Sequence, residues 1–241
     1  MSARSMIVFA LVLAMPTAVA AVPFTDEFPI ESCKFRTTGQ NPYFILKPGR
    51  QLHFSNQACV DAGECDEFEE AIITVLNHTR VITLKEDGKT RNITTRVVKE
   101  VAIVDGELAE ISRNFFAECQ GTQDVYYFGE TVDNYEDGKV VNHDGSWLAG
   151  EKKAEPGIIM PGGAFLLGAR YFQELAPGAA LDRAEHTGVD LEIEVPAGEF
   201  EDCVKVKETS PIDATATSTK IYCPGTGLVI DDELQLEGVF N

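Results

Sequence analysis

The chain has 241 residues, of which 39 are acidic and 20 basic, so its formal net charge is −19. A surface this negative repels nucleic acid and anionic lipid headgroups, and both are therefore excluded as partners. The charge indicates either a surface that keeps the protein in solution or one that attracts cations and basic partners.

The first twenty residues have the pattern of a secretory signal peptide. A basic start is followed by the apolar run Met6–Met15 and by small residues that favour cleavage near Ala20. Pro16 ends the run before the roughly 20 apolar residues that a membrane span needs. We therefore expect residues 1–20 to be removed and residues 21–241 to form one soluble, monomeric β-rich domain without a membrane span. Its predicted location is periplasmic or extracellular.

All six cysteines lie in the part predicted to be exported. An even number of cysteines in an oxidising compartment favours disulfides over reactive thiols. Six cysteines allow 15 pairings, and none of their spacings is typical of a zinc site. We predict the pairs Cys203–Cys223, Cys59–Cys65 and, by elimination, Cys33–Cys119.

The pair Cys203–Cys223 also predicts a strand register. It places Val204 opposite Tyr222 and Val206 opposite Lys220, with a loop of about nine residues between the two strands. Cys203 is accordingly interpreted as part of a structural crosslink and not as a nucleophile.

Aspartate–glycine pairs recur after segments with β propensity in the first part of the chain. Asp-Gly readily adopts the positive φ angles that two-residue hairpins require. Four such pairs predict a mainly β fold, an antiparallel meander that forms a curved half-barrel or a two-layer sandwich with minor short helices. The pairs are Asp87–Gly88, Asp105–Gly106, Asp137–Gly138 and Asp144–Gly145.

A few segments carry helical or loop signals. The segment Glu67–Leu76 fits either a short helix or a strand, because its second half is β-branched. Short turns of helix are expected in Leu166–Leu175 and Gly178–Ala184. The segment Ala149–Gly163 is expected to be a long surface excursion.

Seven motifs in order give the chain a family resemblance. The chain resembles a family of exported, largely bacterial proteins of unassigned function, over about residues 41–230. The resemblance implies a predominantly β domain and carries no catalytic residues; Cys59, Cys65 and Cys223 depart from the family pattern and imply extra disulfides. A looser likeness, by analogy of fold, is to curved periplasmic half-barrels that hold lipid chains. The motifs are Asn41–Gly49, Thr95–Val98, Tyr126–Glu130, Gly145–Gly150, Pro156–Pro161, Val195–Phe200 and Pro224–Val229.

Aromatic and apolar side chains support a binding function, although filling of the core explains most of them. In Tyr126–Phe128, neighbouring rings must lie on opposite faces of a strand, so at least one ring leaves the core or meets a second layer. We predict a pocket for a small apolar ligand, bounded by the loop 157–163. Its candidate residues are Tyr127, Trp147, Met160 and Phe172.

Two other kinds of chemistry are weaker alternatives. Asp133, Glu136 and Asp137 lie within five residues and could bind calcium, although charged hairpin tips are commonly just solvated. His143, next to Asp144 and close to Ser146, suggests a hydrolase, but no nucleophile-elbow motif is present. The sequence therefore predicts a non-enzymatic protein that binds a small apolar ligand or a protein partner, without a cofactor other than calcium. The alternatives are a hydrolase that uses carboxylates or His143, and a structural surface protein with incidental calcium binding.

Overall fold

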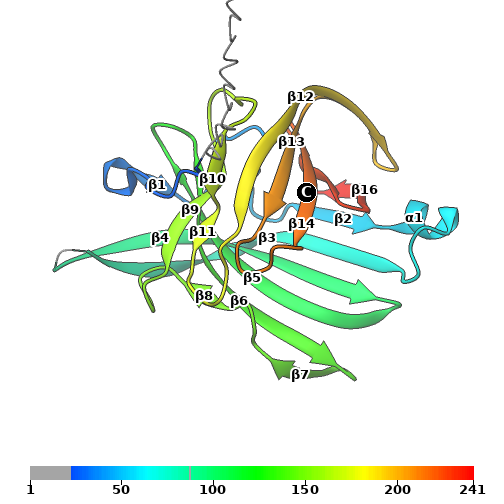
Figure 1. Ribbon diagram of the computed structural model, residues 1–241, viewed down its shortest axis with the longest axis horizontal. Coiled ribbons are helices and arrows are strands. Elements are labelled where there is room, and N and C mark those ends of the chain that lie inside the picture. The colour runs from blue at the N-terminus through cyan, green and yellow to red at the C-terminus, as the bar shows by residue number, and fades with distance from the viewer. Residues whose placement is uncertain (1–22, 87) are drawn as a thin grey trace, which may run out of the picture.

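The computed structural model describes residues 23–86 and 88–241, and its strands form one strongly curved sheet (Figure 1). The predicted signal peptide lies outside these residues. In chain order the first elements are η1 (Ile30–Ser32), β1 (Phe35–Arg36), β2 (Gln51–Ser55), α1 (Gln57–Ala62), β3 (Glu69–Glu86), β4 (Lys89–Val104), β5 (Glu107–Cys119) and β6 (Val125–Glu136). They are followed by β7 (Lys139–Asn142), β8 (Trp147–Leu148), β9 (Glu155–Met160), β10 (Arg170–Phe172), β11 (Glu174–Leu175), β12 (Arg183–Val195), β13 (Gly198–Thr209), β14 (Thr217–Cys223), β15 (Gly227–Asp231) and β16 (Leu234–Phe240).

The predicted antiparallel meander is confirmed in β3 to β6. Asp105 and Gly106 have φ angles of 51° and 82°, and Val104 pairs with Glu107 across them, as a two-residue hairpin requires. The Asp137–Gly138 turn has the same form, with φ angles of 50° and 71°. Position 87 of the first predicted turn lies outside the described residues, but the strands on either side of it are paired. The Asp144–Gly145 turn differs, because it joins β7 and β8, which both pair with β6.

A short segment brings the two ends of the sheet together. In the segment Arg170–Leu175, β10 pairs with β12 at one end of the sheet and β11 pairs with β9 at the other. Gly157 of β9 permits this approach, because an added Cβ would lie 2.4 Å from the carbonyl oxygen of Phe172. The sheet is therefore nearly closed and barrel-like. It confirms the mainly antiparallel β class and curves further than a half-barrel.

Several local expectations are wrong or are now settled. The segments Leu166–Leu175 and Gly178–Ala184 contain strands and turns instead of helix, because sheet closure pairs their backbone. The segment Ala149–Gly163 is not a surface excursion, since it contains β9, which joins the sheet beside β6. The ambiguous segment Glu67–Leu76 runs into strand β3. The α-helix α1 contains Cys59 and ends three residues before its disulfide partner Cys65.

All three predicted disulfides are confirmed. Their Cα–Cα distances are 5.1 Å for Cys33–Cys119, 5.3 Å for Cys59–Cys65 and 4.2 Å for Cys203–Cys223. The predicted register of β13 and β14 is also confirmed, with Val204 opposite Tyr222 and Val206 opposite Lys220. The sulfurs of Cys203 and Cys223 belong to an apolar cluster with Leu236 and its neighbours.

The aromatic run Tyr126–Phe128 explains how the sheet is covered. Tyr126 and Phe128 both form edge-to-face contacts with Phe35, at 5.3 Å and 5.1 Å between ring centroids. Tyr127 points to the opposite face, where its ring stacks on Phe116 at 4.8 Å. All three rings are buried, so none of them leaves the core, and Phe35 of the N-terminal segment covers one face of the run. No described helix is long and apolar enough to cross a membrane.

Candidate ligand-binding cavity

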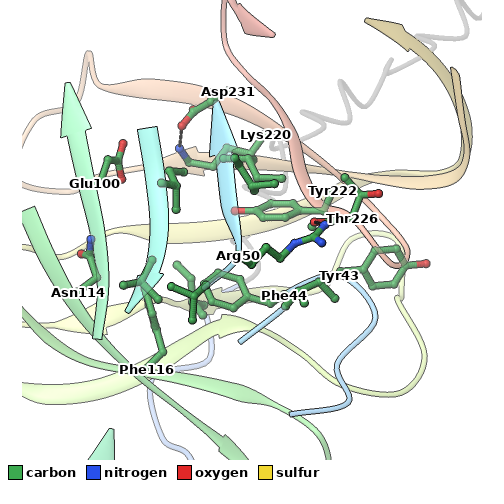
Figure 2. Close-up of a pocket in the computed structure, with 18 of the residues that line it drawn as sticks. Tyr43, Phe44, Arg50, Glu100, Asn114, Phe116, Lys220, Tyr222, Thr226 and Asp231 are labelled. Atoms are coloured by element: carbon green, nitrogen blue, oxygen red, sulfur yellow. Dashed lines mark hydrogen bonds and ion pairs between the residues drawn. The ribbon is translucent and has the colours of Figure 1, made fainter. Parts of the chain in front are cut away.

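The face of the sheet that carries Tyr127 surrounds a cavity of about 210 Å³ (Figure 2). Strands β2 to β6, β9, β14 and β15 contribute to its wall, together with residues 43–45 and 226. The strand register explains which side chains face inward: Val98 is opposite Asn114, and two residues further along Glu100 is opposite Ser112. Alternate residues of neighbouring strands therefore line the same space.

Apolar and aromatic side chains form most of the cavity wall. Phe44 contacts Phe116 edge to face, with 4.9 Å between ring centroids, and Phe116 in turn stacks on Tyr127. Ile73 and Leu228 line the cavity as well. An apolar concave surface of this kind is typical of sites that bind small molecules.

A buried asparagine holds the rim of the cavity in place. The side-chain oxygen of Asn41 accepts hydrogen bonds from the backbone nitrogens of Tyr43 (2.9 Å) and Phe44 (3.1 Å). Its amide nitrogen donates to the carbonyl oxygen of Pro161 at 3.0 Å, and its backbone nitrogen donates to the carboxylate of Glu118 at 3.0 Å. The Asn-Pro-Tyr-Phe motif thus forms a locally bonded turn that directs Phe44 into the cavity.

Charged groups occupy one side of the cavity. The ammonium of Lys220 donates to Asp231 at 2.5 Å and lies 3.8 Å from Glu208. Burial lowers the pKa of Lys220, but Glu208 and Asp231 outweigh it and raise this pKa above its ordinary value. Glu100 also lines the cavity, and burial raises the pKa of its carboxyl group, an effect that Lys220 opposes.

Arg50 is the second cation in the cavity wall, and its side chain is only 8% exposed. Its terminal nitrogens donate to the carbonyl oxygen of Thr226 at 2.9 Å, to that of Gly225 at 3.4 Å and to the side-chain oxygen of Asn241 at 3.1 Å. Its Nε has no hydrogen-bond partner among the described residues. Burial lowers the pKa of Arg50. Figure 2 shows Tyr222 between Arg50 and the Lys220–Asp231 pair.

A chain of hydrogen bonds leads from the cavity residue Tyr127 into the sheet, beside the half-buried Glu130. The hydroxyl group of Tyr127 donates to the side-chain oxygen of Asn114 at 2.6 Å, and the amide of Asn114 donates to Ser112 at 3.1 Å. Desolvation raises the pKa of Glu130, the residue opposite Asn114, to about 7, and the neighbouring Tyr127 hydroxyl group opposes part of this rise. Burial also raises the pKa of Tyr127.

The structure brings only part of the predicted ligand site together. Tyr127 lines the cavity, whereas Trp147 lines a separate cavity of about 220 Å³ and contacts Tyr127 with 5.1 Å between ring centroids. Met160 is fully buried in the core. Phe172 lies on β10, where its ring is 6.1 Å from that of Phe24. Arg50 and Lys220 of the cavity wall were not among the predicted residues, because no local motif marks either one.

The predicted calcium site finds no support in the geometry. Asp133 is paired with Arg113 at 3.1 Å and with His143 at 3.0 Å, while Glu136 and Asp137 lie at the exposed β6–β7 turn. In residues 23–86 and 88–241 no group of three or more His, Cys, Asp or Glu side chains is placed to hold a metal ion. Calcium binding stays a prediction.

The side chains behind the His143 hydrolase hypothesis are also engaged in other contacts. His143 reaches Asp133 and the carbonyl oxygen of Val132. The hydroxyl oxygen of Ser146 accepts a hydrogen bond from the backbone nitrogen of Val132 at 2.8 Å. Ser146 is therefore hydrogen-bonded to the backbone of β6. These contacts do not place His143 as a base beside the Ser146 hydroxyl group, so they give the hydrolase hypothesis no support.

Comparisons with known proteins add little to this description. No protein-family model matches the chain, and no curated protein matches it. Among solved structures it is similar to a putative lipoprotein from Parabacteroides distasonis ATCC 8503, at 14% identity over 85% of this chain and 100% of that one, with a TM-score of 0.34. A likeness at this level leaves the site to be interpreted from its own geometry.

Proposed function

We propose that this is an exported, non-enzymatic protein that binds a small, largely apolar molecule inside its curved sheet. The observation that carries the proposal is the cavity of about 210 Å³ with its wall of aromatic and aliphatic side chains. An engineered cavity of about 150 Å³ holds benzene, so this one has room for a ring with a short substituent or a chain of about eight carbons. The resemblance to a family of exported bacterial proteins is consistent with this proposal.

The disulfides support the exported part of the proposal. Three disulfides join all six cysteines, and such crosslinks persist in oxidising compartments. The proposed location is periplasmic or extracellular. The net charge of −19 agrees with a protein that does not bind nucleic acid.

Binding of 1-octanol tests the proposed function. The titration is followed by calorimetry and by the fluorescence of Trp147, whose ring touches that of the cavity residue Tyr127. In the variant Val98→Phe the added ring fills part of the cavity, and we expect binding to weaken by about tenfold or more.

The matched control is Val81→Phe, which adds the same atoms at an exposed position of the same sheet. We expect this control to bind 1-octanol like the wild type. Absence of binding to the wild type, or equal binding by both variants, would contradict a ligand site in this cavity.

A further inference from the structure

The two cations in the cavity wall differ in their ion pairs. Four charged side chains line the cavity: Arg50, Glu100, Lys220 and Asp231. Lys220 and Asp231 neutralise each other through a 2.5 Å contact. Glu100 takes part in none of the ion pairs between described residues. Arg50 likewise contacts neither of the two cavity carboxylates, Glu100 and Asp231.

The hydrogen bonds of Arg50 go to neutral oxygen atoms and not to a carboxylate. Its two terminal nitrogens bond to neutral oxygens of Thr226, Gly225 and Asn241. None of the ion pairs between described residues involves Arg50. Carbonyl and amide oxygens satisfy hydrogen-bond donors, but they do not neutralise a buried cation, whose removal from water is costly.

One donor of Arg50, a residue of the cavity wall, has no partner among the described residues. This donor is Nε, and the side chain that carries it is more than nine-tenths buried. A buried, unpaired N–H group costs free energy unless a ligand or water satisfies it. A carboxylate is the acceptor that best matches this donor, because guanidinium–carboxylate hydrogen bonds are charge-assisted.

From these contacts we infer that the ligand is a small anionic amphiphile whose carboxylate is held by Arg50 and whose apolar body packs between Phe44, Phe116 and Leu228. This inference rests on the proposed function of the cavity. It explains why an acidic protein places a guanidinium, which has no ion-pair partner among the described residues, beside an apolar space. It also makes amines the weaker class, because the positive charge of Arg50 repels an ammonium group.

Three probes of equal chain length test the inference on the wild-type protein by calorimetry: octanoate, 1-octanol and octylamine. We expect octanoate to bind about ten- to a hundredfold more tightly than 1-octanol, because one charge-assisted hydrogen bond contributes about that much affinity. We expect octylamine to bind most weakly. Equal affinity for octanoate and 1-octanol would overturn the inference and leave the proposed function standing. Tighter binding of octylamine would assign the polar end to Glu100 and Asp231 instead. Binding of none of the probes would overturn both.

Two variants test whether Arg50 causes the preference for octanoate over 1-octanol. In Arg50→Gln the preference for octanoate over 1-octanol should disappear, while binding of 1-octanol stays within about threefold of the wild type. Arg113→Gln removes a positive charge from a partly exposed ion pair on β5 and should leave the preference unchanged. An unchanged preference in Arg50→Gln, or a lost preference in Arg113→Gln, would contradict a specific contact with Arg50.

A spectroscopic measurement covers the case in which Arg50→Gln fails to fold. The carboxyl carbon of ¹³C-labelled octanoate, bound to the wild-type protein, reports the protonation state of the ligand. A nearby guanidinium should lower the pKa of the bound carboxyl group below that of free octanoate, whereas a purely apolar site should raise it. A raised pKa would therefore exclude Arg50 as the partner.

Discussion

Two buried arginines without carboxylate partners show how differently the same side chain is used in this protein. Arg96 of β4 is 6% exposed and Arg50, before β2, is 8% exposed. Burial lowers the pKa of both. All three side-chain nitrogens of Arg96 have partners, and these partners are the oxygens of Thr37 and the carbonyl oxygens of residues 76–78.

The surroundings explain the difference. Residues 76–78 lie in an irregularity of β3, where the pairing with β4 shifts between Val75 and Thr79 and the carbonyl groups lose their partners in the sheet. Arg96 satisfies these groups, so it stabilises the fold. Arg50 donates to two loop carbonyls, and its Nε is left without a partner among the described residues. The difference agrees with a structural role for Arg96 and with the ligand contact that we propose for Arg50.

The largest effect on the free energy of unfolding is expected for Arg96→Gln. The substitution leaves several buried carbonyl groups unsatisfied and should lower the free energy of unfolding by about 4 kcal/mol. Urea denaturation measures the change, with Arg113→Gln as the control for a partly exposed ion pair, which should cost less than about 1 kcal/mol. Equal losses in the two variants would show that Arg96 does not stabilise the irregularity.

The half-buried Glu130 extends the comparison to a side chain that can lose its charge. The pKa of Glu130 is about 7 in the folded protein and 4.5 ordinarily, so the unfolded chain releases this proton at lower pH. The stability that Glu130 contributes is therefore present below pH 4.5 and is lost as pH rises through about 7. The loss amounts to as much as about 3 kcal/mol.

Glu130→Gln tests this dependence, because glutamine does not ionise. The variant should gain stability relative to the wild type between pH 5 and pH 8, as measured by denaturation at both values. Glu136→Gln, at the exposed β6–β7 turn, is the control and should show no such gain. A difference between wild type and Glu130→Gln that does not change with pH would rule out a protonated Glu130 in the folded protein.

The smallest effect is expected for Arg50→Gln. Glutamine can still donate to the carbonyl oxygen of Thr226, and removal of a buried cation that has no ion-pair partner among the described residues offsets part of the lost contacts. The free energy of unfolding should change by no more than about 1 kcal/mol in the absence of ligand. A loss as large as that of Arg96→Gln would make Arg50 a structural residue and remove the basis of the comparison.

The sequence predicted those features that depend on neighbouring residues or on pairing rules. Asp105–Gly106 encodes its own turn, and the spacing of Cys203 and Cys223 was enough to place Val204 opposite Tyr222. The closure of the sheet was missed, because the segment Arg170–Leu175 has helix-compatible residues and becomes strand only through partners distant in the chain.

The cavity was predictable only in outline. Tyr127 was found because an aromatic run on a strand must place one ring on the inner face. Arg50 follows a Pro-Gly turn that gives no hint of burial, and its backbone acceptors Gly225 and Thr226 lie 175 and 176 positions away. Trp147 was expected in the same pocket as Tyr127, but it lies behind Tyr127 and lines a separate cavity.

The crosslink between Cys33 and Cys119 has a consequence for proteolysis. It spans 86 positions and encloses β2 to β4 and most of β5, which form much of the cavity wall. A protease that cuts at the exposed Asp105–Gly106 turn would leave both pieces covalently joined. The nicked protein would keep its mass under non-reducing conditions, and the fragments would separate only after reduction.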